Sequence, residues 1–315
     1  MIEFSNPPIE VLPLPSCSNL DSPKPNADIL RLDKIHPLVS GNKWYKLKYN
    51  IDRASELGYQ RLLSCGGPHS NHLHALACAG KALNFSTVAL VRGYEHLPLT
   101  ETLLDCQDMG MELIFVDKKT YLKRYEPIWC QQQAELHNSY WIPEGGNNEL
   151  GIKGCANIAQ YCREYDEVWI SIGSGCTFTG LAQHLNTGYF IERSKAPSSS
   201  ETAEVTRVRL KGIMAIKGGE ALATKLLSSL GDECVISCDS HLGGFGKCPT
   251  ELITLIKRYD EQGLPLDPVY TAKMVMAFEN QWLSGQLDHT KRYLLIHSGG
   301  LQGRRGVKAL SESLP

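Results

Sequence analysis

Between residues 61 and 142 the chain alternates short apolar runs with longer segments of helical spacing. The apolar runs fall at 61–65, 86–91, 112–116 and 140–142. The segments between them are about 10 to 20 residues long and have the periodicity of helices. Strands separated in this way pair in parallel, because the chain must return across the sheet through a helix. The pattern therefore predicts an open α/β sheet with crossover helices, which are expected at 70–83, 100–109 and 120–137.

A second alternating set follows residue 149 and predicts a second α/β unit. Strands are expected at 167–172, 207–216, 234–237 and 292–297, and helices at 149–163 and 177–186; a further helix is expected at 43–57, before the first set. Residues 1–30, rich in Pro, Ser and Asn, are expected to wrap the surface, and 193–201 have the composition of a solvent-facing loop.

The predicted fold class is α/β, with two open twisted sheet domains and flanking helices. The larger domain is expected to combine residues 1–56 with 149–315, and the smaller α/β domain to span 57–148. Open parallel sheets bind ligands beyond the carboxyl ends of their strands. A ligand site is therefore expected in the crevice between the two units.

The composition excludes partners that require a strong charge. The chain has 315 residues, 32 basic and 34 acidic, with a net charge of -2 and no Lys/Arg-rich run. Nucleic-acid binding is not expected, since it needs a basic face. No apolar run approaches the roughly 20 residues that span a bilayer, and no signal peptide is visible. We predict a cytoplasmic protein that binds a small molecule and does not associate with a membrane.

Metal binding is not expected either. Cys234 and Cys238 lie four apart but have no second pair, and the eleven cysteines lack zinc spacing. His69, His72 and His74 lie close in sequence, yet residues two apart on a helix face different directions and no carboxylate accompanies them. We therefore predict no metal site and reduced, mostly buried cysteines.

A lysine follows a glycine turn at the start of the helix expected at 43–57. The segment is Ser40–Lys46, with Gly41 at the turn and Lys43 at the helix start. Lys46 lies one turn further on the same face, and two ammonium groups there repel one another unless one of them meets an anion. If Lys46 meets a phosphate, Lys43 is free to become a neutral amine that condenses with a carbonyl group.

A glycine-rich loop, Gly173–Gly180, follows the strand at 168–172 and leads into a helix near Thr177. Backbone N–H groups at such a helix start favour a phosphate. The loop lacks the Gly-Lys-Ser/Thr ending of a nucleotide P-loop and the acidic residue expected downstream for a dinucleotide. A turn that merely needs glycine remains the alternative.

A polar helix start, Gly66–His72, follows the strand at 61–65. Its glycines permit a tight turn, and Ser70 and Asn71 lie at a helix N-terminus where they can bind a carboxylate or a ring oxygen. An N-cap without a ligand is the alternative reading.

Together these segments resemble the pyridoxal-phosphate enzymes of the tryptophan synthase β fold (fold type II), specifically the 1-aminocyclopropane-1-carboxylate deaminase and D-cysteine desulfhydrase group. The resemblance runs from about residue 32 to 303. The family pattern Gly-Gly-Asn-Lys-x-Arg-Lys corresponds to Ser40–Lys46 and the Gln-Ser-Asn element to His69–Asn71. It implies pyridoxal 5'-phosphate as cofactor and an amino acid as substrate, and it suggests a homodimer.

The resemblance also implies roles for individual residues. Lys43 would form the internal aldimine and Lys46 would help hold the phosphate. Asn71 would face the cofactor's ring oxygen and Ser70 the substrate carboxylate. The contacts of the phosphate loop would come from Gly173, Ser174, Gly175, Cys176 and Thr177.

Two further segments extend the match. Residues 267–270 resemble the family's Asp-Pro-Val-Tyr segment, which would place Tyr270 near the substrate and Thr271 near the pyridine nitrogen. Residues 296–300 resemble a strand-end His-Thr-Gly-Gly and add Ser298 to the cofactor contacts.

Two positions favour a desulfhydrase. The deaminases carry Glu where this chain has Thr271 and Gln where it has His72, which we place beside the substrate. A carboxylate would keep the pyridine nitrogen protonated, whereas a hydroxyl would only hydrogen-bond to it. We therefore expect α,β-elimination from a D-amino acid such as D-cysteine, giving pyruvate, ammonia and hydrogen sulfide. In that reaction Lys43 takes the α-proton, and Tyr270 orients the substrate or assists the leaving group.

Three alternatives stay open. The first is cyclopropane deamination to 2-oxobutanoate and ammonia, with Tyr270 attacking the ring. The second is a cofactor-binding protein without turnover, and the third a sugar-phosphate or nucleotide enzyme that uses the glycine loop alone. The chain departs from the family pattern at four places, which leaves the natural substrate open: Ser40, Tyr45, Gly67–His69 and Cys176.

Overall fold

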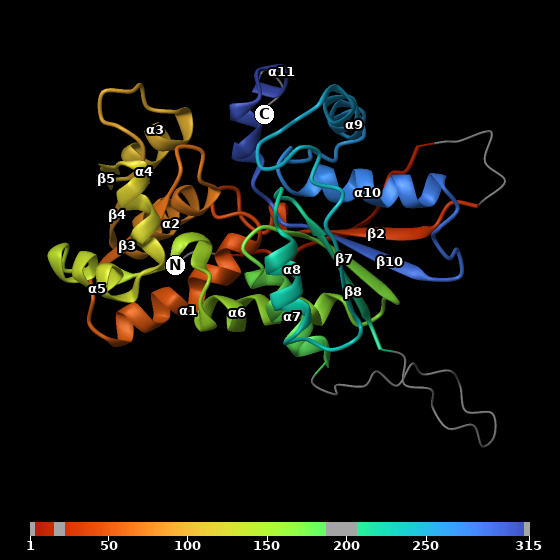
Figure 1. Ribbon diagram of the computed structural model, residues 1–315, viewed down its shortest axis with the longest axis horizontal. Coiled ribbons are helices and arrows are strands. Elements are labelled where there is room, and N and C mark those ends of the chain that lie inside the picture. Colours follow the sequence, from red (N-terminus) through yellow and green to blue (C-terminus); the bar gives the residue numbers. More distant parts are fainter. Residues whose placement is uncertain (1–3, 16–22, 187–206, 312–315) are drawn as a thin grey trace.

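The computed structural model describes residues 4–15, 23–186 and 207–311, and within them the strands form two sheets (Figure 1). The strand order of the large sheet is β1-β2-β10-β7-β8-β9, and that of the small sheet is β5-β4-β3-β6. All neighbouring strands pair in parallel except β1 and β2. The strands of the large sheet are β1 (Ile9–Val11), β2 (Asn26–Arg31), β7 (Glu167–Ile172), β8 (Arg209–Met214), β9 (Cys234–Ser237) and β10 (Arg292–His297). Those of the small sheet are β3 (Arg61–Gly66), β4 (Ser86–Arg92), β5 (Met111–Val116) and β6 (Tyr140–Trp141).

Helices cover both faces of each sheet, as the crossover connections require. The α-helices are α1 (Asn42–Glu56), α2 (Asn71–Leu83), α3 (Glu101–Asp108), α4 (Lys118–Leu122), α5 (Pro127–Leu136), α6 (Glu149–Ala156), α7 (Cys176–Asn186), α8 (Glu220–Leu227), α9 (Thr250–Asp260), α10 (Thr271–Leu283) and α11 (Lys308–Ser311). Short 3-10 helices are η1 (Leu32–Lys34), η2 (Lys123–Tyr125), η3 (Glu144–Gly146), η4 (Asn157–Tyr161) and η5 (Leu301–Gly306). In Figure 1, α9 and α10 lie over one side of the large sheet, and α6 and α7 run along the other.

The core follows the alternation of side chains along the strands. On β7, Trp169 packs with α9 and α10, whereas Val168 and Ile170 pack on the opposite face with residues of η4 and α7. In the small sheet, one face packs against α1, α2 and α3, and the other against Tyr121 and Trp129. Burying both faces explains why the strands of both sheets read as nearly continuous apolar runs.

The expectation that residues 1–30 wrap the surface is wrong for the last part of this segment. Residues 26–31 form β2, the second strand of the large sheet, where Ile29 and Leu30 are fully buried. Two polar residues of this strand have distant partners: Asp28 accepts a hydrogen bond from the Tyr165 hydroxyl at 2.8 Å, and Arg31 donates to Glu10 at 2.6 Å. These partners lie far along the chain, so local composition suggested a surface segment.

The long helix expected at 120–137 is also wrong. The segment forms α4, a 3-10 turn and α5, which begins at Pro127. Proline lacks the N–H that a helix interior needs and clashes with the preceding turn, but it fits the first helical position. The expected helix at 149–163 likewise ends as an α-helix at Ala156 and continues as a 3-10 segment.

The other elements lie within a few residues of their predicted bounds, and the predicted α/β class with two sheets is confirmed. The loop expected at 193–201 lies outside the described residues. The assignment of 1–56 with 149–315 to one domain and 57–148 to another stays a prediction.

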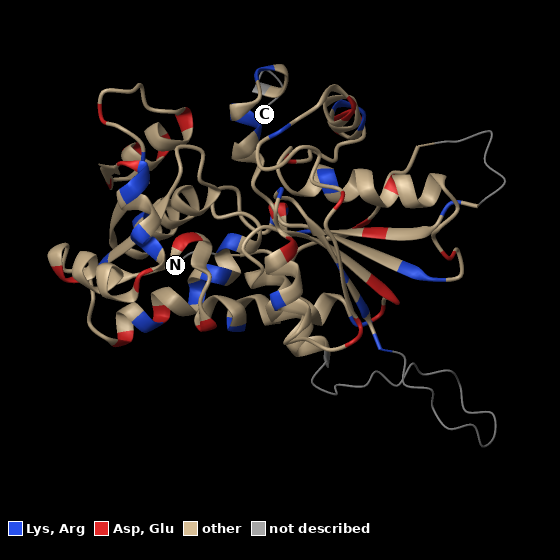
Figure 2. Ribbon diagram, viewed as in Figure 1, with Lys and Arg blue, Asp and Glu red and all other residues tan. Residues whose placement is uncertain are grey.

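Basic and acidic residues are interspersed over both sheets and their helices (Figure 2). This distribution agrees with the net charge of -2. Among the described residues, no helix is both long and apolar enough to cross a bilayer.

Candidate active site

The start of α1 lies where the carboxyl end of β10 meets the start of α7. The Asn42 backbone N–H donates to the Ser298 carbonyl at 3.0 Å, and the Asn42 side-chain amide donates to Thr177 Oγ1 at 3.0 Å. Gly41 adopts φ +74°, and a β-carbon there would lie 2.1 Å from the Ser298 oxygen, so the close approach requires glycine. Three segments that are far apart in sequence therefore meet around Lys43.

Lys43 has the environment of a nucleophilic amine. Its Nζ donates to Asn42 Oδ1 at 2.8 Å. Burial, together with the positive charge of Lys46, lowers the pKa of Lys43 from 10.5 to about 7. Near neutral pH a large share of this side chain is therefore an uncharged amine, which is the form that attacks a carbonyl carbon. The Lys46 side chain is buried on the same helix.

The glycine loop leads from β7 into α7 as predicted. Gly175 adopts φ +85°, and Cys176 and Thr177 form the first turn of α7. Thr177 Oγ1 accepts hydrogen bonds from Asn42 and, at 3.6 Å, from the Cys155 thiol. Its own hydroxyl hydrogen is thus free to point at an anion that is placed at the start of the helix.

Cys176 occupies an unusual electrostatic environment. The neighbouring Cys155 thiol lowers the pKa of the Cys176 thiol, and the positive charges of Lys46 and Lys43 act in the same direction against burial. The Cys176 thiol donates to the Gly146 carbonyl at 3.6 Å. This contact joins the phosphate loop to the turn at Glu144–Gly146.

Three of the predicted cofactor contacts have a buried polar atom without a hydrogen-bond partner. They are Asn71 Oδ1, Ser174 Oγ and Thr271 Oγ1. Leaving such atoms unpaired costs free energy, so most buried polar groups in proteins are paired. A ligand with a phosphate and a polar aromatic ring would supply the missing partners. The residues therefore fit pyridoxal 5'-phosphate, which Lys43, Lys46, Asn71 and the loop would hold.

The start of α2 approaches the site from the small sheet. The Ser70 hydroxyl caps the helix by accepting the Leu73 N–H at 3.2 Å, as the alternative reading of this segment expected. The hydrogen of that hydroxyl can still be donated. Asn71 Nδ2 donates to the Gly300 carbonyl at 3.3 Å, which ties α2 to the turn after β10.

His72 is buried and its Nε2 lies 2.9 Å from Ser64 Oγ. Burial and the charges of Lys43 and Lys46 lower the pKa of His72 to about 3, so the ring is neutral. His72 Nδ1 is buried without a hydrogen-bond partner. The contact of His72 with the substrate stays a prediction.

Tyr270 and Thr271 are placed by one buried carboxylate. Asp267 accepts the backbone N–H groups of Val269, Tyr270 and Thr271 at 3.0, 2.8 and 2.7 Å. A β-carbon at Gly173 would lie 2.9 Å from the Tyr270 ring, so the tyrosine packs directly on the glycine loop. Burial raises the pKa of Tyr270 above its ordinary value, and the phenol is neutral.

Sequence reasoning missed the turn at Glu144–Gly146 and the thiol of Cys155. The turn packs against the lysine helix, since a β-carbon at Gly146 would lie 2.9 Å from Lys46 Cβ. Its signal was visible as Gly145-Gly146-Asn147-Asn148, a run typical of a turn before a helix N-cap. Cys155 gave no local signal, because its role depends on α6 packing against α7.

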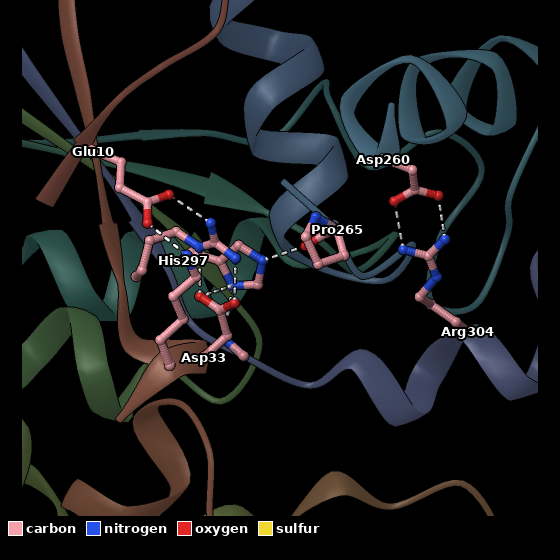
Figure 3. Close-up of polar contacts among 9 residues, drawn as sticks. Glu10, Asp33, Asp260, Pro265, His297 and Arg304 are labelled. Atoms are coloured by element: carbon pink, nitrogen blue, oxygen red, sulfur yellow. Dashed lines mark hydrogen bonds and ion pairs between the residues drawn. The ribbon is translucent and has the colours of Figure 1, made fainter. Parts of the chain in front are cut away.

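His297 was also missed as a structural residue (Figure 3). Its Nδ1 accepts the Gly299 N–H at 3.2 Å and its Nε2 lies 2.7 Å from the Pro265 carbonyl. His297 Nδ1 also lies 3.4 Å from Asp33 Oδ1, and the Asp33 carboxylate in turn binds the buried Arg31. His297 thus links the turn that contacts Gly41 and Asn71 to the segment that leads into Asp267.

The three nearby histidines do not converge. His74 contacts Asp105 at 3.3 Å and Gln302 at 3.4 Å, away from the Ser64 contact of His72. Over the described ranges, no group of three or more His, Cys, Asp or Glu is arranged to hold a metal ion.

Comparison with known proteins agrees with this geometry. Residues 9–299 match the family model described as pyridoxal-phosphate dependent enzyme. A relative in Pyrococcus horikoshii with the provisional name 1-aminocyclopropane-1-carboxylate deaminase is 29% identical over 284 residues, which cover 87% of this chain and 84% of that protein.

Solved structures show the same fold. A structure described as an ACC deaminase homologue has a TM-score of 0.74 and 25% identity, covering 98% of this chain and 94% of that one. Threonine deaminase isoform 2 from Solanum lycopersicum has a TM-score of 0.61 at 15% identity, covering 88% and 75% of the two chains, and shows the fold alone. The chain thus belongs to the pyridoxal-phosphate dependent enzymes, with the cofactor that this name states and a similarity to the 1-aminocyclopropane-1-carboxylate deaminase group.

Proposed function

We propose that this enzyme catalyses α,β-elimination from a D-amino acid such as D-cysteine. With one water molecule, D-cysteine gives pyruvate, ammonia and hydrogen sulfide. The observation that carries the proposal is Thr271, whose hydroxyl lies buried and unpartnered at the start of α10. A hydroxyl at that position, where we place the pyridine nitrogen, does not force its protonation as a carboxylate would.

The cofactor, when bound, supplies an electron sink for the negative charge that develops at the α-carbon. Lys43 takes the α-proton, because its pKa of about 7 leaves a neutral amine available. Ser70, at the start of α2, holds the substrate carboxylate, with Asn71 between it and the cofactor's ring oxygen and His72 beside the substrate.

Tyr270 donates a proton to the departing sulfur. Its buried phenol is neutral, since burial raises its pKa, and its position against Gly173 places it beside the glycine loop. Chloride leaves without a proton, so Tyr270→Phe should slow turnover of D-cysteine much more than that of β-chloro-D-alanine. Equal losses on the two substrates would reject this role for the phenol.

Cyclopropane deamination is the second candidate, and the names of the relatives favour it. In that reaction Tyr270 would attack the ring, and 2-oxobutanoate and ammonia would form. The position of Tyr270 against the glycine loop is compatible with both reactions.

A keto-acid assay decides between the candidates. The substrates are D-cysteine, β-chloro-D-alanine, their L-enantiomers, D-serine and 1-aminocyclopropane-1-carboxylate. We expect pyruvate from the D-amino acids and no 2-oxobutanoate. Release of 2-oxobutanoate without pyruvate from any D-amino acid would establish the deaminase instead, and cofactor binding without any keto acid would indicate a protein without turnover.

We further propose a cytoplasmic homodimer. Most cysteines in the described part of the chain are buried, as expected of reduced thiols that serve as small apolar side chains. The dimer follows from the family resemblance, and sedimentation of the cofactor-loaded protein tests it.

A further inference from the structure

Lys273 is a fully buried lysine whose ammonium group binds three backbone carbonyls. Its side chain is 1% exposed and lies in the first turn of α10, three residues after Tyr270. Nζ donates to the carbonyls of Ala215, His241 and Gly244 at 3.3, 2.9 and 2.7 Å. Three donors meet three acceptors, so the ammonium is satisfied without an ion pair in hydrogen-bonding contact.

Two of these carbonyls belong to residues 239–247, which we call the Phe245 loop. Among the described residues, the loop's other hydrogen bonds stay within 237–247. Lys273 is therefore the side chain that ties the loop to α10 by hydrogen bonds, and Leu242 adds apolar packing against the core cluster that includes α10. The loop backbone is strained enough to need such a tie, because Leu242, which is not glycine, adopts φ +52°.

Phe245 belongs to this loop, and its ring faces Tyr270. Its side chain is 64% exposed, and its ring centre lies 6.1 Å from that of Tyr270 in an edge-on arrangement. An exposed aromatic ring that is held against the proposed substrate tyrosine forms a wall whose position depends on the loop.

The other end of the loop borders an open space. A cavity of about 330 Å³ is lined by Asp239, Ser240, Leu242 and Lys273 together with the outer face of α10. If the tie to Lys273 is lost, this space leaves the loop room to shift, because no packed side chains fill it.

We propose that Lys273 is a positioning residue that holds the Phe245 loop over Tyr270 and thereby restricts the site to amino acids with small β-substituents. The restriction on substrate rests on the proposed elimination, whereas the tether itself does not. Small leaving groups such as hydrosulfide fit beneath Phe245, and a bulky thioether such as that of S-benzyl-D-cysteine does not.

The test compares cofactor-loaded wild type with Lys273→Met, which keeps the length of the side chain but removes the donors. Lys211→Met is the matched control: Lys211 donates to Gln281 on the same side of the large sheet, and it interacts with the loop through the charge of Asp239 without a hydrogen bond to the loop backbone. Lys273→Gln keeps two hydrogen-bond donors but no charge. It replaces the Met variant in the comparison with wild type if the Met variant does not fold.

Hydrogen exchange of residues 239–247 is the direct measurement. In Lys273→Met we expect exchange of the loop amides to accelerate by about tenfold or more, with an intermediate effect in Lys273→Gln and none in Lys211→Met. The absorption band of the bound cofactor should stay unchanged in all three. The tether would be overturned if the loop amides of Lys273→Met exchanged as slowly as those of wild type. It would also be overturned if the loop amides of Lys211→Met exchanged as fast as those of Lys273→Met.

Steady-state kinetics tests the restriction on substrate. For Lys273→Met we expect KM for D-cysteine to rise by about fivefold to twentyfold while kcat changes little, because binding is weakened and the reacting groups remain. The preference for D-cysteine over S-benzyl-D-cysteine in kcat/KM should fall by about tenfold. An unchanged preference would reject the restriction. If wild type forms no keto acid from any amino acid, the proposed function fails, and the exchange experiment still decides the tether.

Discussion

Where α1 meets β10 and α6, backbone atoms lie so close that no side chain fits between them, whereas Tyr270 and the Phe245 loop are each held by hydrogen bonds to a buried charged side chain. A β-carbon at Gly41 would lie 2.1 Å from the Ser298 oxygen, and one at Gly154 would lie 1.7 Å from the Tyr45 oxygen. At the other end of the site, Asp267 holds the segment of Tyr270, and Lys273 holds the loop.

The two ends therefore differ in how they tolerate change. Contacts between backbones leave no room for adjustment, which suits a cofactor that every enzyme of the family must bind. Side-chain tethers can be exchanged one at a time, so the substrate end can vary while the cofactor end stays fixed. Four substitutions or changes of condition test this difference.

The largest effect is expected at the backbone junction. Gly41→Ala combines positive φ with a clash against Ser298 and should destabilise the protein by about 3 kcal/mol or more. Gly58→Ala is the matched control, because Gly58 also has positive φ but nothing lies within 4 Å of its β-carbon position. It should cost about 1 kcal/mol. Urea unfolding of both variants measures the difference, and equal losses would contradict a junction that is limited by space.

A smaller effect is expected from Asp267→Asn at the substrate end. One carboxylate oxygen becomes an amide NH₂ group, so at least one of three backbone N–H groups loses its acceptor, at a cost of about 2 kcal/mol. The displaced Tyr270 should lower kcat more than cofactor affinity. Asp117→Asn, at an exposed helix cap, should change neither. A fall in cofactor affinity with unchanged kcat would contradict this, because it would show that the Asp267 carboxylate supports cofactor binding instead of the position of Tyr270.

The pH dependence of cofactor binding reports on Lys43. Burial and the charge of Lys46 lower the pKa of Lys43 to about 7. The fraction of Lys43 that is a neutral, reactive amine therefore falls tenfold for each pH unit below 7, and above pH 8 nearly all of it is neutral. The rate at which apoprotein acquires the cofactor absorption band should level off above about pH 8. Removing the nearby charge in Lys46→Met should raise the pKa of Lys43 and move the plateau to higher pH. A rate that keeps rising tenfold per unit to pH 10 would show an ordinary lysine.

The smallest effect is expected from Thr271→Val, which removes a buried hydroxyl that has no partner. Without cofactor the variant should be as stable as wild type or up to about 1 kcal/mol more stable, because an unsatisfied group is lost. Cofactor affinity should fall severalfold. Thermal unfolding with and without cofactor separates the two effects, and a loss of stability in the apoprotein would show that the hydroxyl already has a partner.

Much of the fold follows from local patterns, because buried parallel strands read as apolar runs such as 167–172 and 292–297. β2 escaped prediction, since Asp28 is satisfied by the distant Tyr165, and Arg31 needs the distant Glu10 in addition to the nearby Asp33. The glycine loop and the lysine turn could be read from sequence because each is a local backbone motif.

The tethers could not be read in the same way. Lys273 is a single lysine on a helix, and nothing near it in sequence indicates the three carbonyls that it binds. The contact of Cys155 with Thr177 likewise depends on how two helices pack. Long-range contacts of single side chains are set by the tertiary fold, which local patterns do not encode.

The central claim is that Lys43 is the residue that bonds to the cofactor, and chemical trapping tests it most directly. Borohydride reduction of the cofactor-loaded protein fixes the bond between the lysine nitrogen and the cofactor, and peptide mass spectrometry then locates it. We predict the pyridoxyl group on Lys43 alone, with no label in Lys43→Ala. A label on Lys46 or Lys273 in the wild-type protein, or no trapped cofactor at all, would contradict the assignment.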